Sequence, residues 1–239
     1  QDASGKTTGY SIDLCLHVAE QVRKTLGKPD VKVAFHPVEP AQRIPRLKAG
    51  TIDISCGSDT NTAARQKEVD FSYTVFTTGV RFLARAPFPG QGANDLWRKR
   101  VAVTRGTTAH DVMERMRSEQ ETVPVVVNEH AEGVRLLEQG KVDAFAHDEV
   151  LLYELRERSP QRQQLVVTGK FMTVEPYAFM LPKGDAGFRE VVDKALLGLM
   201  QSGEIHTVYR KWFDTEQLRV PMNVYMKENI KYPNRYGAP

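Results

Sequence analysis

A helix-to-strand junction that occurs twice in the chain is the feature that most restricts its fold. A leucine, a glycine three residues later and an aspartate three residues after that begin at Leu47 and again at Leu137. In both copies the leucine lies near the end of an expected helix, the glycine is the usual helix terminator and the aspartate enters an expected strand. Because the surrounding pattern matches too, we favour two similarly built lobes, with a generic turn used twice as the alternative.

Apolar periodicity predicts helices and strands that alternate around these junctions. Helices are expected at residues 11–26, 42–48, 108–118, 131–139 and 149–158. Strands are expected at residues 31–35, 52–56, 100–104, 123–127 and 142–146. Strands that alternate with helices of this length are typical of α/β layers with largely parallel sheets.

The remaining β-rich and helical segments predict how the lobes are connected. We interpret residues 71–85 and 177–181 as two connections between the lobes. The helices expected at residues 188–200 and 204–212 then have to return to the first lobe. The expected lobes are therefore residues 1–80 with 182–239, and residues 81–181.

Composition excludes several classes of protein. With 41% hydrophobic and 26% charged residues, the chain has enough apolar material for a core and is expected to be soluble. No apolar run approaches the roughly 20 residues that cross a bilayer. The net charge is only +3 and basic residues are scattered among acids, so we expect no nucleic-acid partner. Cys15 and Cys56 fit no zinc site, and one disulfide and two buried thiols remain open.

Polar side chains follow three of the expected strands. Ser58, Thr60 and Arg65 follow one, Thr107 follows another where a helix starts, and Asp148 follows a third. In open α/β sheets, ligands bind at the carboxyl ends of strands. An arginine can bind a carboxylate through paired, charge-assisted hydrogen bonds, and an aspartate can accept from a protonated amine. This set of groups therefore predicts an α-amino acid ligand.

Each of these residues also has a purely structural alternative. Arg65 can be a surface arginine, and Ser58, Thr60 and Asp148 can be helix N-caps. Catalytic motifs are missing from the sequence: it has no nucleophile elbow, no phosphate-binding loop and no His-Glu-x-x-His pair. We therefore expect no catalytic residues, no metal and no cofactor, and an enzyme is the less favoured interpretation.

Motifs spread in order over nearly the whole chain resemble one family. They are GYSID at residues 9–13, QRIP at 42–45, CGSDTN at 56–61, RQK at 65–67, TRGTT at 104–108, SGE at 202–204 and KWF at 211–213. The chain resembles the extracytoplasmic solute-binding proteins of amino-acid ABC importers, in particular the glutamate/aspartate-binding branch. The resemblance implies a two-lobed, type II periplasmic-binding-protein fold, whose lobes are joined by two hinge strands and close on a ligand.

The resemblance implies a role for each matched residue. It assigns Arg65 to the ligand α-carboxylate with Ser58 and Thr60 beside it, Thr107 to the second lobe's share of the site, Asp148 to the amine, and Arg43 and His130 to the side-chain end. Arg43 favours a second carboxylate on the ligand. Glu39, Pro40 and Arg105 depart from the family pattern, and a glutamate near the pocket repels an acidic ligand unless it is paired with Arg43.

The family also has a strand and a ligand-contacting loop ahead of the segment that matches Gly9, where this chain has eight residues. A shortened chain, an unresolved segment and a strand donated by another chain each explain the difference. The chain begins with Gln1 and has no basic-then-apolar leader, so we expect either that a signal peptide has been removed or that the chain was shortened.

The resemblance implies a periplasmic, monomeric protein that binds glutamate or aspartate in a cleft between its lobes and delivers it to an ABC permease. Two alternatives come from different classes. One is a dehydratase-like enzyme on the same scaffold, with Glu175 or His130 as general acid. The other is the ligand-sensing module of a receptor.

Overall fold

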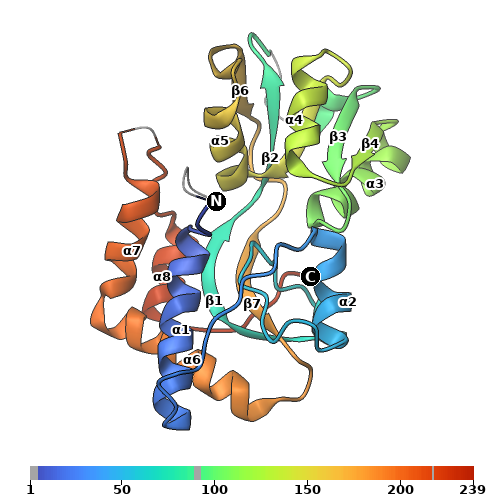
Figure 1. The fold of residues 1–239 in the computed structure, drawn as a ribbon. Helices are drawn as coiled ribbons and strands as arrows, with labels where there is room; N and C mark the ends of the chain where they lie inside the picture. Colours follow the sequence, from blue (N-terminus) through green and yellow to red (C-terminus); the bar gives the residue numbers. More distant parts are fainter. Residues whose placement is uncertain (1–4, 89–92, 217) are drawn as a thin grey trace. The chain divides into compact units, whose positions relative to one another are not determined.

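A computed structural model describes residues 5–88, 93–216 and 218–239 (Figure 1). The chain divides into two compact units. Unit 1 contains Gln1–Val38, Arg43–Thr77 and Pro176–Pro239, and unit 2 contains Glu39–Gln42 and Thr78–Glu175. The main boundaries of these units fall after residues 77 and 175. The lobe boundaries expected from the sequence fall after residues 80 and 181.

Unit 2 contains a five-stranded sheet in the order β4-β3-β5-β2-β6. Its strands are β2 (Val80–Arg85), β3 (Arg100–Thr104), β4 (Val123–Val127), β5 (Ala144–Asp148) and β6 (Leu165–Thr168). β3 runs parallel to β4 and β5, whereas β2 pairs antiparallel with β5 and β6. The sheet is therefore mixed, and the expectation of a largely parallel sheet applies to only three of its strands.

Apolar side chains of unit 2 pack on both faces of this sheet. Its helices are α3 (Thr108–Gln120), α4 (His130–Glu138) and α5 (Glu149–Arg158), with short 3-10 turns at Ala93–Leu96 and Arg162–Gln164. Val101 and Val103 of β3 belong to one cluster with Met113 of α3, and Ala102 belongs to another with Leu137 of α4. The alternation of side chains along β3 thus places α3 and α4 on opposite faces of the sheet.

Unit 1 contains a two-stranded sheet of β1 (Asp70–Thr78) and β7 (Glu175–Leu181). Its helices are α1 (Tyr10–Leu26), α2 (Arg43–Lys48), α6 (Ala186–Ser202), α7 (Glu204–Phe213) and α8 (Val224–Lys231), with a 3-10 turn at Arg65–Lys67, whereas the 3-10 turn at Pro40–Gln42 belongs to unit 2. α1 ends at Gly27, whose left-handed φ of 63° matches the predicted stop. α6 and α7 belong to unit 1, and both pack against α1.

An aromatic cluster stabilises the beginning of α1. The ring of Tyr10 lies 5.7 Å from that of Phe76 and 6.0 Å from that of Tyr209, centroid to centroid. The Tyr10 hydroxyl donates to the carbonyl oxygen of Val75 over 2.9 Å. Burial raises the pKa of Tyr10 well above its usual range, so this hydroxyl stays a neutral donor.

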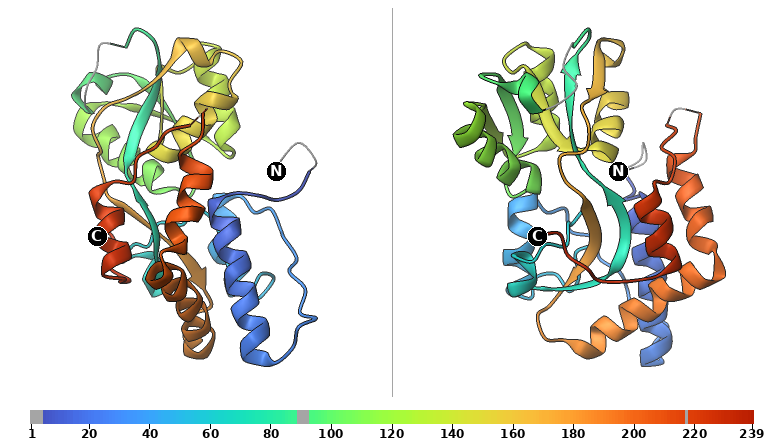
Figure 2. Two further views of the ribbon diagram at one scale, coloured as in Figure 1. Left: turned by 90° about the vertical axis from the view of Figure 1, so that its left-hand side faces the viewer. Right: turned by 180° about the vertical axis from the view of Figure 1, so that it is seen from behind.

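Two strands expected in the first lobe do not form. Residues 31–35 are irregular, run back alongside α1 (Figure 2) and leave Val33 and Phe35 exposed by 37% and 39%. Residues 52–56 are reduced to one antiparallel bridge between Ser55 and Met180. Apolar alternation predicts which face of a strand is buried, but a strand also needs a hydrogen-bonding neighbour, and no other described segment pairs with residues 31–35.

One strand and one α-helix of the described residues were not predicted from the sequence, namely β6 and α8. α8 had a recognisable start signal, because the side chain of Asn223 accepts from the backbone N–H of Met226 over 2.9 Å. Two asparagines also fix this helix to β1: Asn223 donates to the carbonyl of Thr77 and Asn229 to that of Thr74. Such contacts join residues about 150 positions apart, which local sequence patterns do not encode.

Cys15 and Cys56 form a disulfide in unit 1, which resolves the alternative that the sequence left open. The bond joins α1 to the residue that immediately precedes the Gly57 loop. Disulfides persist in oxidising compartments, so the bond fits a protein that works outside the cytoplasm. No helix among the described residues is both long enough and apolar enough to span a membrane.

Gly106, between β3 and α3, cannot accept a side chain without strain. Its φ is +76°, and a Cβ atom there would lie 2.7 Å from the Cα of Ala41, which belongs to the same unit. We expect Gly106→Ala to lower the free energy of unfolding by about 1–3 kcal/mol, measured by urea denaturation. Gly198→Ala is the matched control, because Gly198 lies inside α6 with nothing within 4 Å of the added Cβ. This control should stabilise the protein by up to about 1 kcal/mol, and equal effects of the two changes would contradict the prediction.

Candidate functional site

Asp59 of the CGSDTN segment forms a largely buried ion pair with Arg43 of α2 in unit 1. Asp59 is 2% exposed, accepts a hydrogen bond from the Ser55 hydroxyl over 2.6 Å and pairs with Nη1 of Arg43 at 2.7 Å. The same Nη1 lies 3.4 Å from the backbone carbonyl oxygen of Ser58. Arg43, expected at the side-chain end of a ligand, therefore already has a carboxylate partner within its own unit.

Asp59 was not selected from the sequence, although it lies inside a motif that was. A signal existed in the sequence, because Asp59 follows shortly after an apolar segment expected to be a buried strand. An aspartate in such a place needs hydrogen-bonding partners. The partner Arg43 is 16 residues away, on α2, and nothing in the local pattern identifies it. Asp59 neutralises the charge of Arg43, so Arg43 supports a second ligand carboxylate less strongly than the sequence suggested.

The Arg43–Asp59 pair yields a prediction for stability. Asp59→Asn removes the charged partner of an arginine side chain that is only 17% exposed, so we expect the free energy of unfolding to fall by about 2–3 kcal/mol. The measurement is urea denaturation. Glu68→Gln is the matched control, because it removes a 2.9 Å pair with Lys48 whose side chains are both about half exposed. The control should change stability by less than about 1 kcal/mol, and an equally small effect of Asp59→Asn would disprove the prediction.

Arg65 and Thr60, predicted to act together, are neighbours in unit 1. Nη1 of Arg65 donates to the backbone carbonyl of Thr60 over 2.9 Å, and Thr60 is buried where its backbone bridges to Tyr177 of β7. Arg65 is half-buried, so it is not a freely solvated surface arginine. The N-cap alternative does not apply to Ser58 or Thr60, because the next helical turn is capped at Ala64.

Thr107 of unit 2 is an N-cap in this structure. Its hydroxyl accepts from the backbone N–H of His110 at 3.2 Å and donates to the carbonyl of Thr104 at 2.7 Å. Its own N–H is bonded to the same carbonyl at 3.3 Å. The expected contact of Thr107 with a ligand therefore requires its hydroxyl or N–H to be shared.

Asp148 and His130 are linked through His147 at the carboxyl ends of the inner strands β3 and β5 of unit 2. Asp148 is the last residue of β5 and is 4% exposed. It occupies the N-cap position of α5, but its side chain makes no capping hydrogen bond, so the N-cap alternative is not supported. His130 begins α4, and its Nδ1 lies 2.9 Å from Oγ1 of Thr104 at the end of β3. Between them, His147 approaches His130 at 3.0 Å, a contact that the sequence did not assign.

The structure also gives the exposure and contacts of Glu39 and Arg105, which depart from the family pattern, and of Glu175, the alternative acid. Glu39 is exposed, and Nε of the exposed Arg105 lies 3.3 Å from the side-chain oxygen of Asn128. Glu175 is 2% exposed and accepts from the Thr108 hydroxyl over 2.8 Å. Among the residues that the structure describes, no group of three or more His, Cys, Asp or Glu side chains is placed to hold a metal ion.

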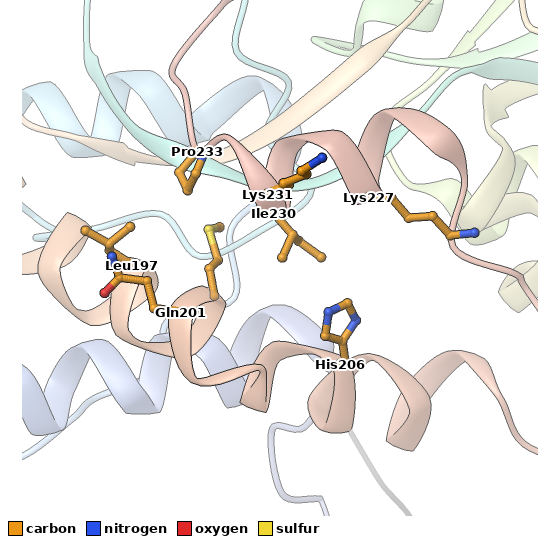
Figure 3. Close-up of a pocket in the computed structure, with 8 residues that line it drawn as sticks. Leu197, Gln201, His206, Lys227, Ile230, Lys231 and Pro233 are labelled. Carbon is orange, nitrogen blue, oxygen red and sulfur yellow. The ribbon is translucent and has the colours of Figure 1, made fainter.

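A pocket of about 420 Å³ lies in unit 1. It is lined by Leu197, Met200, Gln201, His206, Lys227, Ile230, Lys231 and Pro233. Figure 3 shows the side chains of His206 on α7 and Ile230 on α8 pointing toward one another. None of the predicted ligand-binding residues lines this pocket, so it is not the predicted amino-acid site.

Comparison with known proteins identifies the family. Residues 1–215 match the bacterial extracellular solute-binding proteins, family 3. The L-glutamate/L-aspartate-binding protein of Pseudomonas aeruginosa is 38% identical over 242 residues, which cover 98% of this chain and 80% of that protein. The glutamate/aspartate import solute-binding protein of Escherichia coli K12 is 33% identical over 241 residues, with the same coverage.

A solved structure supports the same assignment at the level of the fold. An ancestral arginine-binding protein bound to glutamine has a TM-score of 0.81 and 28% identity, covering 90% of this chain and 92% of that one. The likeness confirms the expected α/β fold class, that of type II periplasmic binding proteins. The chain belongs to the bacterial extracellular solute-binding proteins, family 3.

Proposed function

We propose that the protein binds glutamate or aspartate in the periplasm and delivers it to an ABC permease. The family description confirms the expected location outside the cytoplasm. The observation that carries the choice of an amino acid is Asp148, a buried carboxylate at the carboxyl end of β5. Such a group is suited to accept hydrogen bonds from a protonated amine.

The other end of the ligand is assigned to unit 1. Arg65 binds the α-carboxylate through its guanidinium group, with Ser58 and Thr60 beside it. The acidic preference is supported by the two relatives whose names specify glutamate and aspartate. Arg43 and His130 are proposed for the ligand side chain, and of these His130 is the stronger candidate, because Arg43 is already paired with Asp59.

Delivery follows from population shift. A ligand stabilises the conformational state that binds it more tightly, and a permease that recognises this state distinguishes loaded from empty protein. We propose that the protein acts as a monomer. We also propose that it binds no nucleic acid, because its small net charge comes from interspersed acids and bases. Light scattering with and without ligand measures the oligomeric state.

Isothermal titration calorimetry with a panel of amino acids tests the ligand. Glutamate and aspartate should bind, glutamine and asparagine should bind more weakly, and arginine should not bind. Tighter binding of glutamine than of glutamate would disprove the acidic preference while leaving an amino-acid-binding protein. If no amino acid of the panel binds, the proposal is disproved.

We further propose that the protein catalyses no reaction of its ligand. The enzyme alternative requires an acid such as Glu175, whose carboxylate is buried and bonded to the Thr108 hydroxyl. Incubation with cyclic carboxylates, followed by mass spectrometry, detects the loss of water that a dehydratase would cause. Such a product, formed by the wild-type protein and not by Glu175→Gln, would establish the enzyme instead. A membrane-spanning continuation in the full gene would favour the receptor module.

A further inference from the structure

Four groups at the carboxyl ends of β3 and β5 in unit 2 form a continuous line of hydrogen bonds. The backbone N–H of Asp148 donates to Nδ1 of His147 over 2.7 Å. Nε2 of His147 lies 3.0 Å from Nδ1 of His130, and the same Nδ1 lies 2.9 Å from the Thr104 hydroxyl. His147 and Thr104 are buried, and the two imidazole rings meet edge to face with centroids 4.4 Å apart.

The backbone N–H at the start of this line fixes where the protons lie. A backbone N–H can only donate, so Nδ1 of His147 accepts and carries no hydrogen. A neutral His147 then has its proton on Nε2, from which it donates to Nδ1 of His130. His130 therefore holds its own proton on Nε2, and the Thr104 hydroxyl can at most share the single lone pair of Nδ1 with the Nε2–H of His147.

The opposite tautomer of His130 is disfavoured by the same contacts. A proton on Nδ1 of His130 would face the Nε2–H of His147 across 3.0 Å, which places two donors against each other. Moving the His147 proton to Nδ1 would instead oppose the N–H of Asp148 across 2.7 Å. Oδ2 of Asp148 lies 3.8 Å from that atom, beyond hydrogen-bond distance, so it does not compensate for this clash.

The geometry points to His147 as a positioning residue that holds His130 in its Nε2–H tautomer, so that His130 offers an N–H donor to the side-chain acceptor of the bound amino acid. The inference rests on the proposed function for the identity of the ligand, but the tautomer itself does not depend on the ligand. Preorganising the donor has a defined benefit, because a ring already in the required tautomer does not have to be converted when the ligand binds.

Nitrogen-15 NMR of the imidazole rings tests the tautomer directly, because long-range proton–nitrogen correlations distinguish Nδ1–H, Nε2–H and charged rings. In the unliganded wild-type protein near pH 7.5, His130 should give the Nε2–H pattern. An Nδ1–H or charged pattern for His130 would overturn the inference, whatever the protein binds. This readout needs no variant to fold and no ligand to be identified.

Three variants then test the role of His147. His147→Leu removes the donor, so His130 should populate the Nδ1–H tautomer by donating to Thr104, and glutamate affinity should fall about tenfold. His147→Gln keeps an N–H donor near the position of Nε2 and should restore both the tautomer and most of the affinity. His110→Gln is the matched control, because His110 lies on α3 and is not part of this hydrogen-bonded line. It should leave both readouts unchanged.

The outcomes separate this inference from the proposed function. If the wild-type protein binds no amino acid but His147→Leu still shifts the His130 tautomer, the positioning role stands and the proposed ligand fails. If glutamate binds and His147→Leu changes neither the tautomer nor the affinity, the positioning role fails and the proposed function stands. A loss of affinity in His147→Gln equal to that in His147→Leu, with the tautomer kept, would show a merely structural role and would also overturn the inference.

Discussion

Replacement of Arg65 by alanine is expected to weaken glutamate binding by about 100-fold or more. The change removes the proposed partner of the α-carboxylate and leaves that charge without a hydrogen-bonding cation in the bound state, a loss that typically costs about 2–5 kcal/mol. The glutamate affinity of Arg65→Lys should lie between those of the wild-type protein and Arg65→Ala, because lysine keeps the charge but cannot form the paired bonds of a guanidinium group. Calorimetric titration of the three proteins with glutamate measures the series.

The Arg65 variants need a control for structure, because Arg65 also donates to the carbonyl of Thr60. Thermal melting without ligand separates a loss of folding from a loss of binding. Arg46→Ala removes an exposed arginine of the same unit and should leave the affinity unchanged. Wild-type affinity in a folded Arg65→Ala protein would remove the α-carboxylate assignment.

Loss of the Cys15–Cys56 disulfide is expected to have the largest effect on stability. The bond closes a loop with a sequence separation of 41, for which the chain-entropy model gives about 4 kcal/mol. In a chain of this size the double change Cys15→Ser with Cys56→Ser should lower the melting temperature by roughly 10 °C. Calorimetric melting of the oxidised protein and the variant makes the comparison.

The reduced wild-type protein is the control for the serine variant. Reducing agent should lower the melting temperature of the wild-type protein to near that of the variant, and should leave the variant itself unchanged. A thiol reagent should detect no free cysteine in the unfolded, unreduced chain. Melting temperatures of variant and oxidised protein within a degree of each other would contradict the predicted contribution of the bond.

Several elements of unit 2 could be predicted closely because local patterns specify them, although β6 and the antiparallel pairing of β2 were not predicted. Residues 123–127 and 149–158 form β4 and α5 with the predicted bounds. In unit 1, the irregular residues 31–35 show the limit of this reasoning, because the apolar pattern is present while the neighbour that would complete a strand is not among the described residues. Strand formation depends on the partner as well as on the segment.

The residues of the candidate site could likewise be predicted only in part from local sequence patterns. Asp148 and Arg65 were recognisable because polar residues at strand ends are a local signal. The pairing of Arg43 with Asp59 and the contact between His130 and His147 link different elements, so only the folded chain reveals them. The assignment of ligand contacts to all seven predicted site residues stays a prediction, and the Arg65 and His147 variants address its two ends.

The position of the disulfide also connects its chemistry to the ligand. Cys56 immediately precedes the loop that contains Ser58 and Thr60, so an oxidised bond restricts the same backbone that the proposed ligand would hold. Thermodynamic linkage makes such an influence mutual: whatever free energy the bond adds to binding, the ligand adds to the bond. Saturating glutamate should therefore shift the thiol–disulfide equilibrium toward the oxidised protein by the same factor by which oxidation tightens glutamate binding.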